Sequence, residues 1–207
     1  MAVFFVSGID TSCGKTFITG LLAKREILSG KSAITQKFVQ TGCDGFSEDI
    51  AEHRRLMGVG LFPEDIDGTT CPYVFKFPAS PHLSAKLEGA QIDENIISSA
   101  TEKLSKKYGT VFVEGAGGLM VPVREGLLTI EYISQRKLPL ILVVSAKLGS
   151  INHALLSFAA CRYFGVNLAK VVFNNYPKED ERLSSETKSY IKKRLQKDFP
   201  NCEFEEF

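Results

Sequence analysis

The sequence has almost no excess of charge of either sign, because 25 basic and 24 acidic residues leave a net charge of +1 at pH 7. Proteins that bind nucleic acids by bulk charge need a clustered basic excess, so the composition argues against that class. The first fourteen residues contain no lysine or arginine, and we expect no signal peptide there. The longest apolar run, around residues 138–144, is too short to span a bilayer.

The sequence also lacks any CxxC pair. Its cysteines number five, which is odd, so neither a disulfide framework nor a zinc ribbon is expected. Reduced thiols suit a cytosolic protein, and we therefore expect a cytoplasmic location. The cysteines are Cys13, Cys43, Cys71, Cys161 and Cys202.

Short apolar runs alternate with longer amphipathic stretches along the chain. The strand-type runs cover residues 2–7, 32–38, 110–113, 140–145 and 168–173. The helix-type stretches cover residues 15–29, 93–107, 128–137, 150–164 and 179–197. Apolar strands that alternate with helices are typical of a parallel sheet covered on both faces. We therefore expect an α/β protein with three layers, α/β/α, around a mostly parallel sheet.

The length of 207 residues predicts a single domain that spans residues 1–207. The segment 41–91 is predicted to be irregular, because it contains four of the eight prolines. Loops on a rigid sheet are where binding usually takes place, so this segment is expected to contribute to a site.

A glycine-bounded loop lies between the first predicted strand and the first predicted helix. Residues 8–16 read Gly-Ile-Asp-Thr-Ser-Cys-Gly-Lys-Thr, one residue longer between the glycines than the standard GxxxxGK[ST] phosphate loop. Backbone N–H groups at a helix start bind anions, and Lys15 and Thr16 can reach nucleotide phosphates and Mg²⁺ respectively. The loop predicts a fold of the P-loop NTPase type, although a plain strand-to-helix turn remains the alternative. The predicted ATP contacts are Asp10, Thr11, Ser12, Cys13, Gly14, Lys15 and Thr16.

Two carboxylates are candidates to hold the cation together with Thr16. Glu114 ends an apolar strand, as expected for an acid that helps hold the metal in nucleotide hydrolases. Asp49 follows the second predicted strand, but an acidic residue without a metal, at the start of an ordinary helix, would give the same sequence pattern. The predicted metal ligands are therefore Thr16, Asp49 and Glu114.

These segments, taken together, resemble the dethiobiotin synthetases. The resemblance rests on residues 8–16, 37–42, 48–50, 80–82, 113–122 and 148–153 and on Asn174, which follow the family's order. Three features depart from the family pattern. Phe38 stands where the family has proline, and Glu48 stands where it has a small residue. The family's C-terminal Leu-Gly-x-Ile-Pro strand, in a region that helps to cradle the base and ribose, has no counterpart in residues 176–207.

The resemblance implies an ATP- and Mg²⁺-dependent ligase of biotin biosynthesis. Its substrate would be 7,8-diaminononanoate, which takes up CO₂ as a carbamate and closes to dethiobiotin with release of ADP and phosphate. Lys15 and Lys37 would be the catalytic residues, because both can face the carbamate and the γ-phosphate. Cys13 would be a small filler, since the substrate supplies the nucleophiles. Glu114, Gly117 and Asn174 would complete the ATP site.

The resemblance also implies where the diamine binds. Thr11, Lys37, Thr41 and Ser80 would contact it near the phosphates, whereas His82 is expected to be structural. The substrate's carboxylate tail would bind a segment contributed by the neighbouring subunit of a homodimer, formed by Leu148, Gly149, Ser150 and Asn152. The alternative for this segment is an ordinary helix start capped by Ser150.

Two other functions compete with this interpretation. An amide synthase of the cobyrinic acid type needs an appended glutaminase domain, for which 207 residues leave no room. A regulatory ATPase switch that positions septa or partitions DNA usually carries an extra lysine early in its phosphate loop, and residues 9–12 contain none. The second alternative stays open at the level of the sequence.

Overall fold

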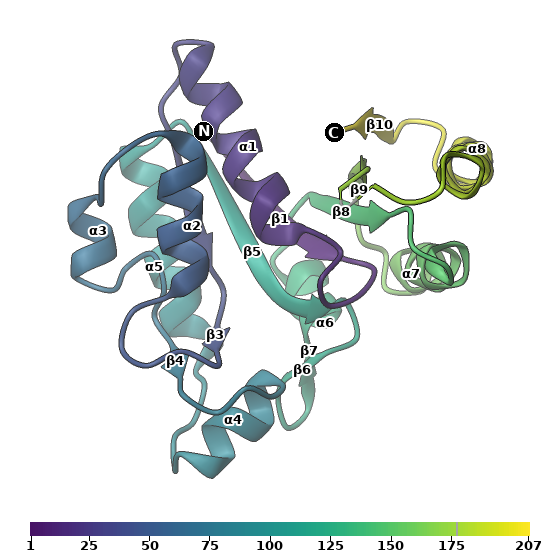
Figure 1. Ribbon diagram of the computed structural model, residues 1–207. Coiled ribbons are helices and arrows are strands. Elements are labelled where there is room, and N and C mark those ends of the chain that lie inside the picture. The colour runs from purple at the N-terminus through teal and green to yellow at the C-terminus, as the bar shows by residue number, and fades with distance from the viewer. Residues whose placement is uncertain (177) are drawn as a thin grey trace.

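The computed structural model describes residues 1–176 and 178–207 and is built on a six-stranded sheet in the order β10-β9-β8-β1-β5-β2 (Figure 1). Every neighbouring pair in this sheet is parallel. The strands are β1 (Ala2–Gly8), β2 (Ala33–Lys37), β5 (Thr110–Gly118), β8 (Leu140–Ser145), β9 (Leu168–Asn174) and β10 (Glu203–Glu206).

Helices cover both faces of the sheet. They are α1 (Lys15–Leu28), α2 (Glu48–Met57), α3 (Pro63–Ile66), α4 (Pro81–Leu87), α5 (Glu94–Lys107), α6 (Thr129–Gln135), α7 (Ser150–Tyr163) and α8 (Glu181–Asp198). Successive side chains of a strand point to opposite faces, and Phe5 and Val6 of β1 accordingly enter two different apolar cores. One core includes α5, α6, α7 and α8, and the other includes α1 and α2. The predicted three-layer α/β/α fold is confirmed.

The carboxyl ends of four neighbouring strands, β8, β1, β5 and β2, lie on the same side of the parallel sheet. β1 lies between β5 and β8, and β5 also pairs with β2. In this register Glu114 of β5 stands opposite Val6 of β1 and Lys37 of β2. Ligands of parallel α/β sheets bind at the carboxyl ends of the strands, beside the position where the strand order reverses. The loop that follows β1 lies at this position.

The segment 41–91 was predicted to be irregular, and that prediction is wrong for much of it. It contains α2, α3 and α4, and a short parallel pair joins β3 (Gln40–Thr41) to β4 (Val74–Phe75). Apolar periodicity did not reveal α2, because its inward face is partly polar. His53 and Arg54 are buried on that face beside Ile50, Leu56 and Met57. An antiparallel pair, β6 (Pro122–Arg124) with β7 (Leu127–Leu128), was also not predicted.

Strand β10 is another element that the apolar pattern did not reveal. It adds to the sheet edge in parallel with β9 although it lacks the expected family motif. Glu203 and Glu205 of β10 both pair with Lys170 of β9, at 3.0 and 2.9 Å. Charged side chains are common on edge strands, where they discourage pairing with other chains. An edge strand of this kind therefore lacks the apolar run by which the other strands were predicted.

A buried ion pair holds α2 against the rest of the protein. Arg54 is 2 % exposed and donates to both carboxylate oxygens of Asp65, over 2.8 and 2.7 Å, and to the Thr35 hydroxyl of β2 over 2.7 Å. Burial by itself would raise the pKa of Asp65, but the bonds to Arg54 outweigh burial and lower it. The bonds of Arg54 thus fix α2 relative to Asp65 of α3 and Thr35 of β2.

Within residues 1–176 and 178–207, no helix combines the length and apolarity needed to cross a membrane. The five cysteines are free.

Candidate active site

The phosphate loop predicted from the sequence joins β1 to α1. Gly14 precedes α1 with φ of +97°, and a Cβ at this position would lie 2.1 Å from the Asn174 amide nitrogen. Only glycine therefore fits there. No side chain of the described residues caps the first turn of α1, so its backbone N–H groups remain available to an anion. Lys15 is 7 % exposed, and its ammonium reaches back across the loop to the Asp10 carbonyl at 3.0 Å.

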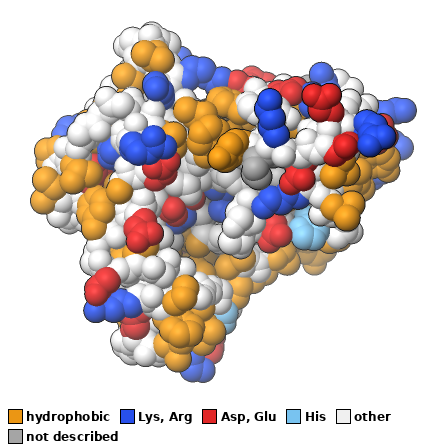
Figure 2. Space-filling model, in the orientation of Figure 1, with side chains coloured by type: hydrophobic (Ala, Val, Ile, Leu, Met, Phe, Trp, Pro, Cys, Tyr) orange, Lys and Arg blue, Asp and Glu red, His pale blue; other side chains and the backbone are white. Residues whose placement is uncertain are grey.

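A cavity of about 560 Å³ opens beside this loop. Eleven of the predicted site residues line it: Thr11, Ser12, Gly14, Lys15, Thr16, Lys37, Thr41, Asp49, Glu114, Gly117 and Asn174. Basic and acidic side chains lie next to one another in the middle of the face shown in Figure 2. Asp10 and Cys13 do not line this cavity. Cys13 is 2 % exposed, which agrees with its expected role as a small filler.

The three predicted metal ligands meet in the cavity. The Thr16 hydroxyl lies 3.1 Å from Asp49 Oδ1 and 2.9 Å from Glu114 Oε1. Among the residues that the structure describes, no three or more His, Cys, Asp or Glu side chains form a metal cluster. A cation here would therefore rely on one hydroxyl, two carboxylates and the oxygens of a nucleotide or water, the donor set that Mg²⁺ prefers. The residues present fit such an ion.

Lys37 lies between the two carboxylates. Its ammonium is 2.9 Å from Glu114 Oε1, pairs with Asp49, and donates to the Gly115 carbonyl over 3.2 Å. Burial opposes the charged form of Lys37, but Glu114 and Asp49 outweigh burial and raise its pKa. The two carboxylates thus favour the charged form of Lys37, and the side chain lines the cavity.

Glu114 is the most enclosed charge of the site. Its residue is 1 % exposed, and burial by itself would raise the pKa of the carboxyl. Contacts with Lys37 and His53 outweigh burial and lower that pKa, so the carboxylate stays ionised. His53 was not predicted as a site residue, although its imidazole Nε2 lies 2.7 Å from Glu114 Oε2. The available signal was its spacing, four residues after Asp49, which places both side chains on one face of a helix.

Comparison with known proteins agrees with this geometry. A family model described as an AAA domain matches residues 2–196. A dethiobiotin synthetase of Haemophilus ducreyi, named ATP-dependent dethiobiotin synthetase BioD 2, is 49 % identical over 98 % of this chain and 96 % of its own length. A protein of the same name from Haemophilus influenzae is 52 % identical over 86 % of this chain and 93 % of its own length. The chain belongs to the dethiobiotin synthetase family.

Solved structures support the fold alone. A ParA family ATPase from Chlorobium tepidum superimposes with a TM-score of 0.56 at 14 % identity, over 100 % of this chain and 84 % of its own. The cell division protein FtsY of Thermotoga maritima superimposes with a TM-score of 0.55 at 18 % identity, and this chain spans 59 % of its length. The P-loop NTPase architecture is therefore shared well beyond the dethiobiotin synthetase family.

Phe38, which departs from the expected dethiobiotin synthetase pattern, lies outside the cavity. Its ring is 1 % exposed and packs on Phe5 and Tyr132, with centroids 5.4 and 4.8 Å away. Its backbone N–H donates to the Glu114 carbonyl over 2.8 Å, a bond that proline could not make. Phe38 thus belongs to the core behind the site, and Lys37 and its neighbours form the cavity wall.

The far end of the cavity is lined by Asn174, whose role in ATP binding stays a prediction, and by two aromatic residues. The Asn174 amide is occupied within the protein, because it donates to the carbonyls of Cys13 and Tyr176 over 3.0 Å each. Phe17 and Tyr176 line the cavity here with ring centroids 6.1 Å apart, and neither was predicted. The Asn175 N–H donates to the Phe207 carbonyl over 2.9 Å, so the C-terminal residue supports this wall.

The remaining predicted substrate residues lie outside the cavity of a single chain. Ser80 precedes α4, and its hydroxyl lies 3.0 Å from His82 Nδ1. The alternative in which Ser150 caps α7 is wrong, because Gly149 occupies the capping position and the Ser150 hydroxyl lies 3.1 Å from that of Ser145. Leu148 is 89 % exposed and Asn152 is exposed, so a role for either in substrate binding stays a prediction.

Proposed function

We propose that this protein is an ATP-dependent dethiobiotin synthase. It would carboxylate 7,8-diaminononanoate with CO₂ and close the ring to dethiobiotin, releasing ADP and phosphate. The observation that carries the proposal is the meeting of Lys15, Lys37 and Thr16 in one cavity beside the phosphate loop. The names of relatives about half identical in sequence supply the substrate class.

The chemistry requires charge placement rather than a nucleophilic side chain. One amine of the substrate adds to CO₂ and loses a proton, which gives a carbamate. A carbamate oxygen attacks the γ-phosphorus of ATP, and the bond to ADP breaks. The second amine then attacks the carbamoyl carbon, loses a proton and expels phosphate. Lys15 and Lys37 would hold the anions in line, since phosphoryl transfer depends chiefly on positioning and electrostatic stabilisation.

Mg²⁺ would be held by Thr16, Asp49 and Glu114, whose oxygens already converge. Bound there, it would neutralise the negative charge on the phosphate oxygens. Lys37 contacts the same two carboxylates and would keep them ionised and oriented toward the cavity.

We also propose that two copies form the working enzyme. A second cavity, of about 360 Å³, joins Asp10 and Thr11 of the phosphate loop to His153 of α7. Met120 and Leu156 line this cavity and are 53 % and 63 % exposed. A partner copy would cover this apolar surface, and the start of its α7 would offer N–H groups to the substrate carboxylate. The five free thiols suit a cytoplasmic location.

One assay tests the function directly. Release of ADP should require both the diamine and bicarbonate, and dethiobiotin should appear in equal amount. ATP hydrolysis that is indifferent to both compounds would contradict the proposal and would favour a regulatory ATPase.

Asn152→Ala is expected to raise the KM for the diamine more than the KM for ATP. The reason is that a contact with the remote carboxylate supplies binding energy to substrate and transition state alike. Steady-state kinetics with each substrate varied in turn measure the difference.

An analogue with an amidated tail is the matched control for Asn152→Ala. It should lose affinity in the unmodified protein and lose little more in the variant, because both changes remove the same interaction. Equal effects on both KM values, or a fully active monomer, would count against a tail site shared between subunits.

A further inference from the structure

His53 is a buried polar side chain that the proposed reaction does not use. His53 is fully buried, and its Nε2 lies 2.7 Å from Glu114 Oε2. A carboxylate only accepts hydrogen bonds, so Nε2 carries the proton of this bond. The other ring nitrogen, Nδ1, has no hydrogen-bond partner among the described residues. Within the described part of the chain, the imidazole therefore hydrogen-bonds to Glu114 and to no other group.

The two oxygens of Glu114 have different surroundings. Oε1 lies 2.9 Å from both the Thr16 hydroxyl and the Lys37 ammonium, and these side chains line the cavity. Oε2 faces His53, which does not line the cavity. A carboxylate turns easily about its last side-chain bond. The bond to His53 opposes that rotation and keeps Oε1 toward the cavity.

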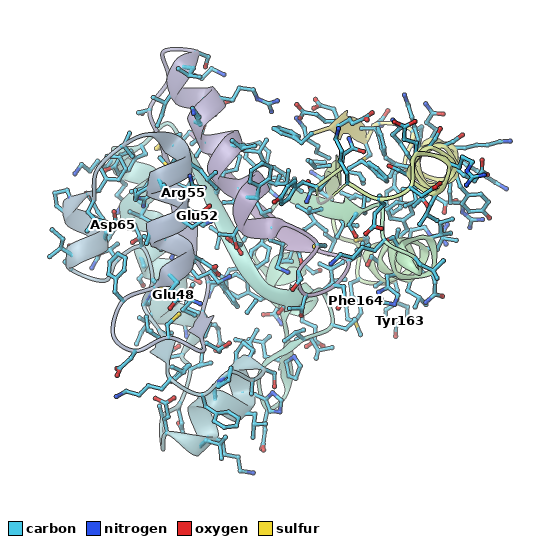
Figure 3. All side chains as sticks on the ribbon, viewed as in Figure 1. Glu48, Glu52, Arg55, Asp65, Tyr163 and Phe164 are labelled. Carbon is cyan, nitrogen blue, oxygen red and sulfur yellow. The ribbon has the colours of Figure 1, made fainter. Side chains whose placement is uncertain are left out.

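Helix α2 carries His53 and Asp49 on the same face, one turn apart. Figure 3 shows Glu48, Glu52 and Arg55 along this helix, with Asp65 on the neighbouring α3. The buried pair between Arg54 and Asp65 anchors the helix. One rigid element therefore supplies a carboxylate to the cavity and a hydrogen-bond donor behind the second carboxylate.

We propose that His53 is a positioning residue that sets the orientation of Glu114 for the binding of a divalent cation. The inference rests on the proposed function, which assigns Thr16, Asp49 and Glu114 to the cation. Groups that hydrogen-bond to metal ligands from outside the coordination sphere typically change metal affinity or activity by about 10- to 100-fold when removed. A histidine with a purely structural role would affect stability without changing cation affinity.

The test compares His53→Leu with His53→Gln. Leucine fills similar space without a donor, whereas glutamine retains an N–H group that can reach the carboxylate. Binding of Mn²⁺ is measured by electron paramagnetic resonance on the protein with a non-hydrolysable ATP analogue. We expect His53→Leu to weaken Mn²⁺ binding by about 10-fold or more. We expect His53→Gln to restore most of the affinity, and affinity for the analogue in EDTA to be unchanged in both variants.

Ile50→Val is the matched control, because Ile50 is buried on the same helix, loses one methylene in the variant, and has no side-chain group that can hydrogen-bond to Glu114. If His53→Leu does not fold, His53→Asn replaces it, since the shorter amide cannot span the distance to the carboxylate. Mn²⁺ affinity that is unaltered in the folded variant, or equally lowered in Ile50→Val, would overturn the proposal. Failure of the unmodified protein to bind Mn²⁺ with the analogue would instead overturn the metal assignment, and this inference with it.

Discussion

Lys15→Ala is expected to lower turnover by roughly 10³-fold or more while leaving the protein folded. The lost ammonium would otherwise offset the charge that develops on the transferring phosphoryl group, and removing such a cation or donor typically costs this much. Among the residues that the structure describes, the Lys15 ammonium makes one hydrogen bond, to the Asp10 carbonyl at 3.0 Å. The expected loss of stability is therefore only about 1 kcal/mol. Steady-state turnover and thermal unfolding measure the two effects separately.

Lys31→Ala is the matched control for Lys15→Ala. The Lys31 side chain is 64 % exposed and pairs with Glu26 at 3.2 Å, on the surface near the end of α1. Its loss removes the same charge from the protein without reaching the cavity, so turnover should be unchanged. Near-normal turnover in Lys15→Ala would refute the assignment of this loop to phosphate binding.

Glu114→Gln is expected to lower kcat/KM by roughly 10²-fold or more and to raise the Mg²⁺ concentration required for half-maximal turnover. The amide keeps the shape of the carboxylate but removes its charge, and a bound metal supplies several kcal/mol of transition-state stabilisation. Asp49→Asn should act in the same direction. Titration of turnover with Mg²⁺ at saturating ATP measures both. Glu114→Gln should also lower the stability of the protein, because the buried Lys37 then keeps Asp49 as its one carboxylate partner among the described residues.

Glu48→Gln provides the comparison for both carboxylate variants. Glu48 is exposed in the first turn of α2, directly before Asp49, and does not line the cavity. Its loss should leave the Mg²⁺ requirement unchanged. A structure with the bound ion far from both Asp49 and Glu114 would defeat the metal assignment.

Local patterns were sufficient for the elements whose buried residues are apolar. Strands β1, β5, β8 and β9 each contain a run of mainly apolar residues, and their prediction depends only on neighbours in the sequence. The same method failed for α2, whose inward face carries His53 and Arg54 and is stabilised by ion pairs and hydrogen bonds. A polar residue in a sequence does not show whether a distant partner will make its burial favourable.

The sequence by itself determined the phosphate loop, because Lys15 and Thr16 follow directly from a motif between a strand and a helix. It also determined the order of the main strands and helices. Only the tertiary structure decided that Glu114 meets Thr16, Lys37 and His53, since these contacts require β5 to lie between β1 and β2. Contacts of this kind depend on the order of strands in the sheet, which is a property of the whole chain and not of any local pattern.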